Sequence, residues 1–182
     1  MEETQPESNG GFVERIKRLL GIESKREEIH RFLDESEEKG LIDQEEGEMI
    51  EGIVDLKQTV AREIMIPRIH IDALPRTADK QTVLDTLIRS GHSRIPVYKD
   101  NVDSIVGILN AKDLLPLWRD DVNEVELASI WRAPFFVPET KRVKDLLREM
   151  RAKKSHMAII VDEYGGTSGI VTIEDIVEEI IG

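Results

Sequence analysis

Apolar residues near the C-terminus of this 182-residue chain form short continuous runs and then change to helical spacing. Residues 158–161 and 169–171 are apolar runs separated by a pair of glycines, which is typical of a β-hairpin with a glycine-rich turn. Beyond the second run, apolar residues recur on one helical face: Ile173, Ile176, Val177 and Ile180. The C-terminal end is therefore predicted to form two strands joined by a turn, followed by an amphipathic helix.

Thr172 stands where the second strand becomes the helix, and Asp175 follows three residues later. These two side chains can cap the helix as a capping box, in which each accepts a hydrogen bond from the other residue's backbone. Alternatively, a hydroxyl and a carboxylate at a helix N-terminus can contact a ligand, because free N–H groups and the helix dipole favour anions there. The local pattern alone leaves both interpretations open.

The same pattern occurs twice in the chain. Gly107–Asp113 repeats as Gly169–Asp175 with an offset of 62 positions (169 − 107 = 62). The offset extends backwards without a gap, so that Arg94–Val97 corresponds to His156–Ile159. The sequence therefore contains an internal duplication, which is the first feature that a fold prediction must explain.

Each copy contains a complete set of α/β elements. Predicted helices at 80–90 and 142–153 correspond between the copies, and Pro67 and Pro134 open the two units beside short apolar stretches. Each unit is predicted to form strand, helix, strand, strand and helix. Two copies are too few for an open solenoid, so we expect an α/β (α+β) pair that buries its apolar sheet faces against each other.

The repeated unit, with its Gly-Ile-Val-Thr-x-x-Asp signature, resembles a CBS domain, the module named after cystathionine β-synthase. Several further motifs resemble the CorC/HlyC-type magnesium and cobalt efflux proteins. They are Met65-Ile66-Pro67-Arg68, His92-Ser93-Arg94-Ile95-Pro96-Val97, Ala111-Lys112-Asp113-Leu114-Leu115 and Asp162-Glu163-Tyr164-Gly165-Gly166. The resemblance runs from about Gly40 to Gly182 and implies tandem CBS domains packed as a pseudo-two-fold pair after N-terminal helices.

The resemblance also implies a domain organisation. Residues 1–58 would be a disordered arm and helical connector, 59–119 the first CBS domain and 127–182 the second. The family continues beyond the position of Gly182 into a small transporter-associated domain, so the sequence is expected to be a piece of a longer protein.

The N-terminal part contains helix signals but no candidate catalytic residue. Asp43 and Glu46 predict a capping box at the start of one helix, and Gly40 is predicted to end the helix before it. Residues 12–20 have one apolar helical face, which would contact a membrane surface or a partner, or stay unstructured. Residues 117–125 are acidic and are predicted to be a solvated linker.

The charge of the chain argues against several functions. The net charge is −12, divided as −8 over residues 1–62 (17 acids, 9 bases) and −4 over residues 63–182 (20 acids, 16 bases). This acidic balance argues against a nucleic-acid partner, because nucleic-acid binding depends on neutralising phosphates with Lys and Arg side chains. No apolar run approaches the ~18 residues of a membrane span, and the polar start differs from a signal peptide. We therefore expect a cytoplasmic chain.

Catalytic and metal-binding motifs are absent from the sequence. There are no cysteines, and Walker, Rossmann and Gly-x-Ser-x-Gly motifs do not occur. The four histidines lack the spacing of metal ligands: His30, His70, His92 and His156. We therefore expect no catalytic residue and no metal site in the protein itself, and predict that the chain is not an enzyme.

The CBS resemblance implies an adenine nucleotide, ATP or AMP, in the cleft between the repeats. Thr172 would then contact phosphate, Asp175 the ribose hydroxyls, and Arg94 the polyphosphate, with Ile95 and Pro96 in the same segment. The adenine would be lined by four apolar residues: Ile64, Met65, Ile66 and Ile159. The alternative, that these apolar residues only form the core, stays open. Any Mg²⁺ would arrive on the phosphates.

The first repeat departs from this pattern at one position. Asn110 replaces the Thr and keeps Asp113 three residues later. Since Asn is an excellent N-cap, a purely structural role gains support there. We therefore expect one occupied nucleotide site and a second that is weak or vacant.

Two functions remain in view. The first is a regulatory nucleotide-binding module of a CorC-like magnesium and cobalt efflux protein. The second is a ligand-free dimerisation scaffold that positions a further domain or a membrane partner. Both predict a homodimer, with association at the inner membrane only through partners.

Overall fold

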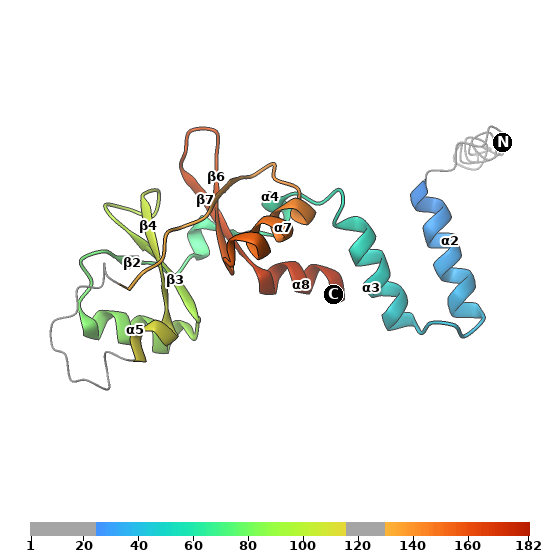
Figure 1. The fold of residues 1–182 in the computed structure, drawn as a ribbon, viewed down its shortest axis with the longest axis horizontal. Helices are drawn as coiled ribbons and strands as arrows, with labels where there is room; N and C mark the ends of the chain where they lie inside the picture. Colours follow the sequence, from blue (N-terminus) through green and yellow to red (C-terminus); the bar gives the residue numbers. More distant parts are fainter. Residues whose placement is uncertain (1–24, 116–129) are drawn as a thin grey trace, which may run out of the picture. The chain divides into compact units, whose positions relative to one another are not determined.

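A computed structural model describes residues 25–115 and 130–182 of the chain (Figure 1). The segments at 12–20 and 117–125, for which the sequence suggested a helix and a linker, lie outside these described residues. The chain divides into two compact units between Val54 and Asp55. No described helix is long and apolar enough to cross a membrane.

The first unit contains helices α2 (Lys25–Glu38) and α3 (Gln44–Asp55), the latter ending at the boundary between the units. The predicted capping box at the start of α3 is confirmed. Glu46 N donates to Asp43 Oδ1 at 2.9 Å, and Asp43 N donates to Glu46 Oε2 at 2.9 Å. Gly40 follows α2 with a positive φ of 66°, a conformation that favours glycine after a helix.

The second unit contains the duplication. The first repeat runs through β2 (Leu74–Pro75), α5 (Lys80–Ser90), β3 (Arg94–Tyr98), β4 (Ile105–Asn110) and the 3₁₀ turn η2 (Ala111–Leu114). The second runs through β5 (Phe136–Pro138), α7 (Val143–Lys153), β6 (Met157–Val161), β7 (Thr167–Thr172) and α8 (Ile173–Ile181). In both repeats the first strand is parallel to the second, and the second is antiparallel to the third. This order confirms the predicted tandem α/β fold.

The two repeats exchange their entering segments. After the short helix α4 (Ala61–Ile64), strand β1 (Ile66–Pro67) pairs with β7 of the second repeat, placing Ile66 opposite Ile170. The 3₁₀ turn η1 (Arg68–His70) then leads the chain back to the first repeat. In the reverse direction, Arg132 bridges to Ile108 of β4. Each repeat is therefore completed by a segment that precedes the other in sequence.

Two repeat-related glycines allow this exchange. A Cβ on Gly169 would lie 2.5 Å from the carbonyl oxygen of Ile66 and 2.8 Å from the sulfur of Met65. A Cβ on Gly107 would lie 2.6 Å from the Trp131 ring. Both positions need glycine because the exchanged segments cross the strands where a side chain would stand.

Three hydrophobic clusters of the described residues hold the second unit together. One lies between α7, α8 and their sheet, and contains Ala158 and Ile160 of β6. A second lies between α5 and the other sheet. The third contains Ile159 from the opposite face of β6 together with Ile108 and Ile170. Because β6 alternates between two clusters, its continuous apolar sequence reflects burial on both faces.

Candidate functional site

The junction of β7 and α8 forms a complete capping box. Asp175 N donates to Thr172 Oγ1 at 3.3 Å, and Thr172 N donates to Asp175 Oδ2 at 2.6 Å. The Thr172 hydroxyl also donates to Asp175 Oδ2 at 2.8 Å. Asp175 Oδ1 makes no hydrogen bond to another residue in the described part of the chain. The capping interpretation is thus confirmed, and one carboxylate oxygen stays available.

An ion pair joins the two repeats beside this junction. Arg94 at the start of β3 donates through Nη1 to Glu174 Oε1 of α8 at 3.1 Å. Burial favours the neutral form of Glu174, but a backbone hydrogen bond and the Arg94 guanidinium outweigh it and lower the pKa of this carboxyl. The Arg94 side chain is only 22% exposed, so its charge is partly shielded from water.

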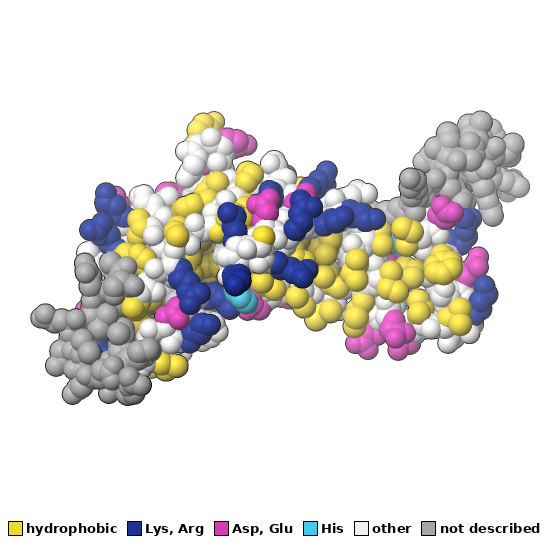
Figure 2. Space-filling model, viewed as in Figure 1, with side chains coloured by type: hydrophobic (Ala, Val, Ile, Leu, Met, Phe, Trp, Pro, Cys, Tyr) yellow, Lys and Arg dark blue, Asp and Glu magenta, His cyan; other side chains and the backbone are white. Residues whose placement is uncertain are grey.

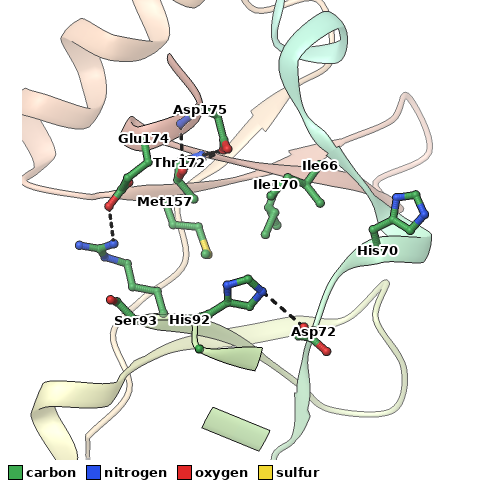
Figure 3. A pocket seen from close by; sticks show the side chains of 12 residues that line it. Ile66, His70, Asp72, His92, Ser93, Met157, Ile170, Thr172, Glu174 and Asp175 are labelled. Atoms are coloured by element: carbon green, nitrogen blue, oxygen red, sulfur yellow. Dashed lines mark hydrogen bonds and ion pairs between the residues drawn. The ribbon is translucent and has the colours of Figure 1, made fainter. Parts of the chain in front are cut away.

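A cavity of about 310 Å³ opens along the seam at this ion pair (Figure 3). Thr172, Glu174 and Asp175 line one side, and His92 and Ser93 line the side that belongs to the first repeat. The remaining lining comes from both repeats: Ile66, His70, Asp72, Gly91, Arg94, Met157 and Ile170. The seam therefore holds a space with an apolar floor and polar groups on opposite walls, an arrangement typical of small-molecule sites.

The first-repeat wall is shaped by the end of α5. Asp79 caps the start of this helix, accepting from Thr82 N at 2.8 Å, and Gly91 ends it with a positive φ of 68°. The turn at Gly91 brings His92 to the cavity, where its Nε2 lies 3.4 Å from Asp72 Oδ2. Figure 3 shows this pair facing the Thr172 side across the cavity.

The structure brings together four of the ten predicted site residues around this cavity. They are Ile66, Arg94, Thr172 and Asp175. Ile64 and Met65 pack instead against the cluster beneath α7 and α8. Three others are fully buried in the core and do not line the cavity: Ile95, Pro96 and Ile159. Asp113, the tenth, lies at the corresponding junction of the first repeat.

The first-repeat junction is occupied by the protein's own side chains. Asp113 accepts from Asn110 Nδ2 at 2.8 Å and from Arg132 Nη2 at 3.0 Å. The Asn110 hydrogen bond lowers the pKa of Asp113 most; desolvation opposes it, and Arg132 lowers the pKa further. The cavity at this junction measures only about 40 Å³.

The CBS domain family matches residues 61–119 and 122–182, one match for each repeat. The chain is also 46% identical over 157 residues to magnesium and cobalt efflux protein CorC of Pasteurella multocida, covering 86% of this chain and 52% of that protein. The chain is a CBS domain pair of the CorC family. It spans between about half and two thirds of the length of the curated CorC relatives that it matches.

Solved structures agree with this assignment. The CBS domain of a bacterial CNNM/CorC family Mg²⁺ transporter is 45% identical, with a TM-score of 0.79, covering 86% of this chain and 95% of that one. The CBS domain of a bacterial CNNM/CorC family Mg²⁺ transporter in complex with ATP is 46% identical to this chain, with a TM-score of 0.71. The match covers 75% of this chain and 97% of that one. A CBS-domain pair with bound AMP from Klebsiella pneumoniae is 29% identical, with a TM-score of 0.58 and coverage of 68% and 99%.

The sequence did not predict which residues of this CBS pair contact each other at the seam cavity. Glu174 precedes Asp175 directly, yet its contact with Arg94 joins residues 80 positions apart. Asp72 and His92 were also missed as neighbours. The sequence contained one signal for Glu174: its repeat equivalent, Lys112, carries the opposite charge (174 − 62 = 112).

Proposed function

We propose that this CBS pair binds an adenine nucleotide in the seam cavity and serves as the regulatory module of a CorC-like magnesium and cobalt efflux protein. The observation that carries the proposal is the cavity itself, which places Arg94, Thr172 and Asp175 from different repeats around one space. The ATP and AMP complexes of the related CBS structures support this choice of ligand.

The contacts of Asp175 favour a role in ribose binding. Its Oδ2 is used by the capping box, whereas Oδ1 can accept from the adjacent ribose hydroxyls without breaking the helix cap. Thr172 differs, because its hydroxyl proton already points to Asp175. Thr172 therefore contacts phosphate only if that proton turns away, and Arg94 is the stronger phosphate donor.

The charge around the cavity favours a nucleotide that carries a divalent cation. Asp72, Glu174 and Asp175 all line the space, where their carboxylates repel a bare polyphosphate. No cluster of three or more metal-ligating side chains occurs among the described residues. We therefore propose that Mg²⁺ enters on the phosphates and offsets this repulsion.

The closed capping box favours a second candidate function. The Thr172 hydroxyl and Asp175 Oδ2 already satisfy one another, as a purely structural helix start requires. In this alternative the pair is a ligand-free scaffold that dimerises and positions another domain or a membrane partner. A dimer suits both candidates, so oligomeric state does not separate them.

Calorimetric titration with ATP and AMP, with and without Mg²⁺, separates the two. Asp175→Asn is the informative variant, because the single amide oxygen can replace Oδ2 in the cap, whereas the NH2 group that then takes the place of Oδ1 cannot accept from the ribose hydroxyls. We expect at least about a tenfold loss of affinity, the effect of losing a hydrogen bond to a charged group.

A matched control removes a helix cap elsewhere. Asp79→Ala deletes the N-cap of α5, and Asp79 itself does not line the cavity. This variant should lower thermal stability without changing nucleotide affinity. If the wild-type chain gives no heat with any nucleotide, the scaffold is correct. If Asp175→Asn binds as tightly as wild type, Asp175 does not hold the ligand.

The role in the whole protein is also proposed. Nucleotide binding would bias the arrangement of the two repeats, because a ligand shifts an equilibrium only through different affinities for its states. The CBS pair would lie on the cytoplasmic side as a homodimer and report nucleotide to a membrane-bound transport partner. The CorC relatives supply the expected cargo, magnesium and cobalt.

A further inference from the structure

The small cavity at the first-repeat junction differs in chemistry from its larger counterpart. It is lined by Arg132, Lys154 and His156, and by Arg94, which also lines the large cavity. None of its lining residues is acidic: Arg94, Ile108, Asn110, Arg132, Ala133, Lys154, Ser155, His156 and Met157. The large cavity, in contrast, has three carboxylates. The duplicated fold has therefore produced one acidic and one basic pocket.

Repeat equivalence shows where the change occurred. The pairing of Arg94 with Asn110 and of Met157 with Thr172 sets β3 and β6 at an offset of 63, one residue more than the ungapped 62 expected from the sequence (157 − 94 = 63). At this offset Lys154 takes the place of Gly91, and His156 takes the place of Ser93. Arg132 opposes Ile108 on β4 as Ile66 opposes Ile170 on β7, so a guanidinium replaces an apolar side chain on the pocket wall. The basic character arises at several independent positions.

Two of these basic side chains remain available. Arg132 binds Asp113 and Arg94 binds Glu174, but Lys154 and His156 are exposed and form no side-chain hydrogen bond or ion pair within the described residues. Figure 2 shows Lys and Arg side chains gathered on one face over α7 and its neighbouring strands. A cationic pocket in a chain of net charge −12 attracts anions locally.

Lys154 is also held in an unusual backbone conformation. It ends α7 with a φ of 52°, and within the described chain all other residues with positive φ are glycines, including Gly91 at the end of α5. A lysine there costs about 1 kcal/mol or more relative to a conformation that suits it. Such an outlier at a pocket is consistent with retention of the cation for binding.

The size of the pocket limits its ligand. Its volume of about 40 Å³ exceeds the roughly 10–15 Å³ that one water needs, but it is far below the 310 Å³ of the large cavity. It has no room for a nucleoside and suits a small anion such as a phosphoryl group. Arg94 and Met157 line both cavities, so the two spaces share a wall.

We propose that this basic pocket, formed by Arg132, Lys154 and His156, receives the terminal phosphates of a nucleotide whose nucleoside lies in the large cavity. The inference rests on the proposed nucleotide function and adds specificity to it. The pocket favours nucleoside triphosphates over monophosphates, because only a polyphosphate extends past Arg94. The two repeat junctions thus bind opposite ends of one ligand.

The test compares ATP, AMP and pyrophosphate by calorimetry at one fixed Mg²⁺ concentration. Lys154→Gln removes a charge from the exposed rim and leaves a polar side chain only one atom shorter. Lys144→Gln is the matched control, because it removes the same charge from an exposed position on α7 that lines neither cavity. We expect Lys154→Gln to weaken ATP and pyrophosphate about five- to tenfold and AMP less than about twofold. Lys144→Gln should change none of the three by more than about twofold.

Each outcome decides the question. If Lys154→Gln leaves ATP affinity unchanged, or weakens ATP and AMP equally, the phosphate pocket is refuted. If wild type binds neither ATP nor AMP, the proposed nucleotide function fails. The titration with pyrophosphate then tests separately whether the basic pocket binds an anion. In that case, pyrophosphate binding that weakens in Lys154→Gln supports an anion pocket. If wild type does not bind pyrophosphate, the anion pocket is refuted.

Discussion

The exchange of strand β1 onto β7 gives a quantitative prediction for Gly169→Ala. The added Cβ would lie 2.5 Å from the Ile66 carbonyl oxygen, whereas an ordinary carbon–oxygen contact is about 3.3–3.6 Å, so the segments must separate by about 1 Å. Overpacking of this kind costs about 1–3 kcal/mol. Loss of backbone freedom in the unfolded chain returns about 0.4–1 kcal/mol. We therefore expect a net destabilisation of about 1–2 kcal/mol.

Thermal unfolding and amide hydrogen exchange measure this effect. A destabilisation of that size should lower the melting temperature by about 3–10 °C for a unit of this length. Exchange should accelerate most at β1, because this strand contains only Ile66 and Pro67. Since Ile66 lines the large cavity, nucleotide affinity should fall as well.

The control for Gly169→Ala is a substitution at the adjacent residue, Ser168. Ser168→Ala changes the neighbouring strand position without adding volume, and should alter stability by no more than about 0.5 kcal/mol. A melting temperature of Gly169→Ala within about 1 °C of wild type, with unchanged exchange at Ile66, would refute the close crossing of β1 and β7.

Three further predictions follow from individual contacts. Ile159→Ala should cost about 2–5 kcal/mol in urea unfolding, because Ile159 is fully buried between the sheets; a smaller loss would mean that the seam is loosely packed. Gly107→Ala should destabilise the protein by displacing Trp131, which a shift in tryptophan fluorescence would reveal; an unchanged spectrum would contradict the contact. The folded-state pKa of Glu174 lies below its ordinary value of 4.5, so its stabilising contribution is present above that pH and is lost on acidification. Glu174→Gln should therefore flatten the decline of the urea midpoint between about pH 6 and pH 3, and an identical slope would contradict the role of its pair with Arg94.

The local elements of the fold were predictable because their signals lie within a few residues. The α5 helix occupies residues 80–90, as predicted, and the hairpin of β6 and β7 follows the two apolar runs. The caps at Asp43 and Thr172 are contacts between residues three apart. The duplication with its offset of 62 also predicted that two similar units would pack together.

The candidate site was predicted less completely, because its walls come from distant segments. Ile159 and Ile95 resemble cavity residues in sequence, but both are fully buried. A continuous apolar run shows that a strand is buried on both faces; it does not show whether either face borders a cavity. The residue type therefore could not distinguish a core position from a ligand contact.

The sequence by itself determined the repeated α/β units, their helix starts and turns, and the hydroxyl–carboxylate pair at Thr172 and Asp175. Only the tertiary structure decided that Arg94 reaches Glu174, that β1 completes the opposite repeat, and that one junction has a large cavity while the other keeps only a small pocket beside Arg132. The physical reason is the range of the interactions. Capping and periodicity act within a turn or a strand, whereas pairing across the seam depends on how two separately formed surfaces meet.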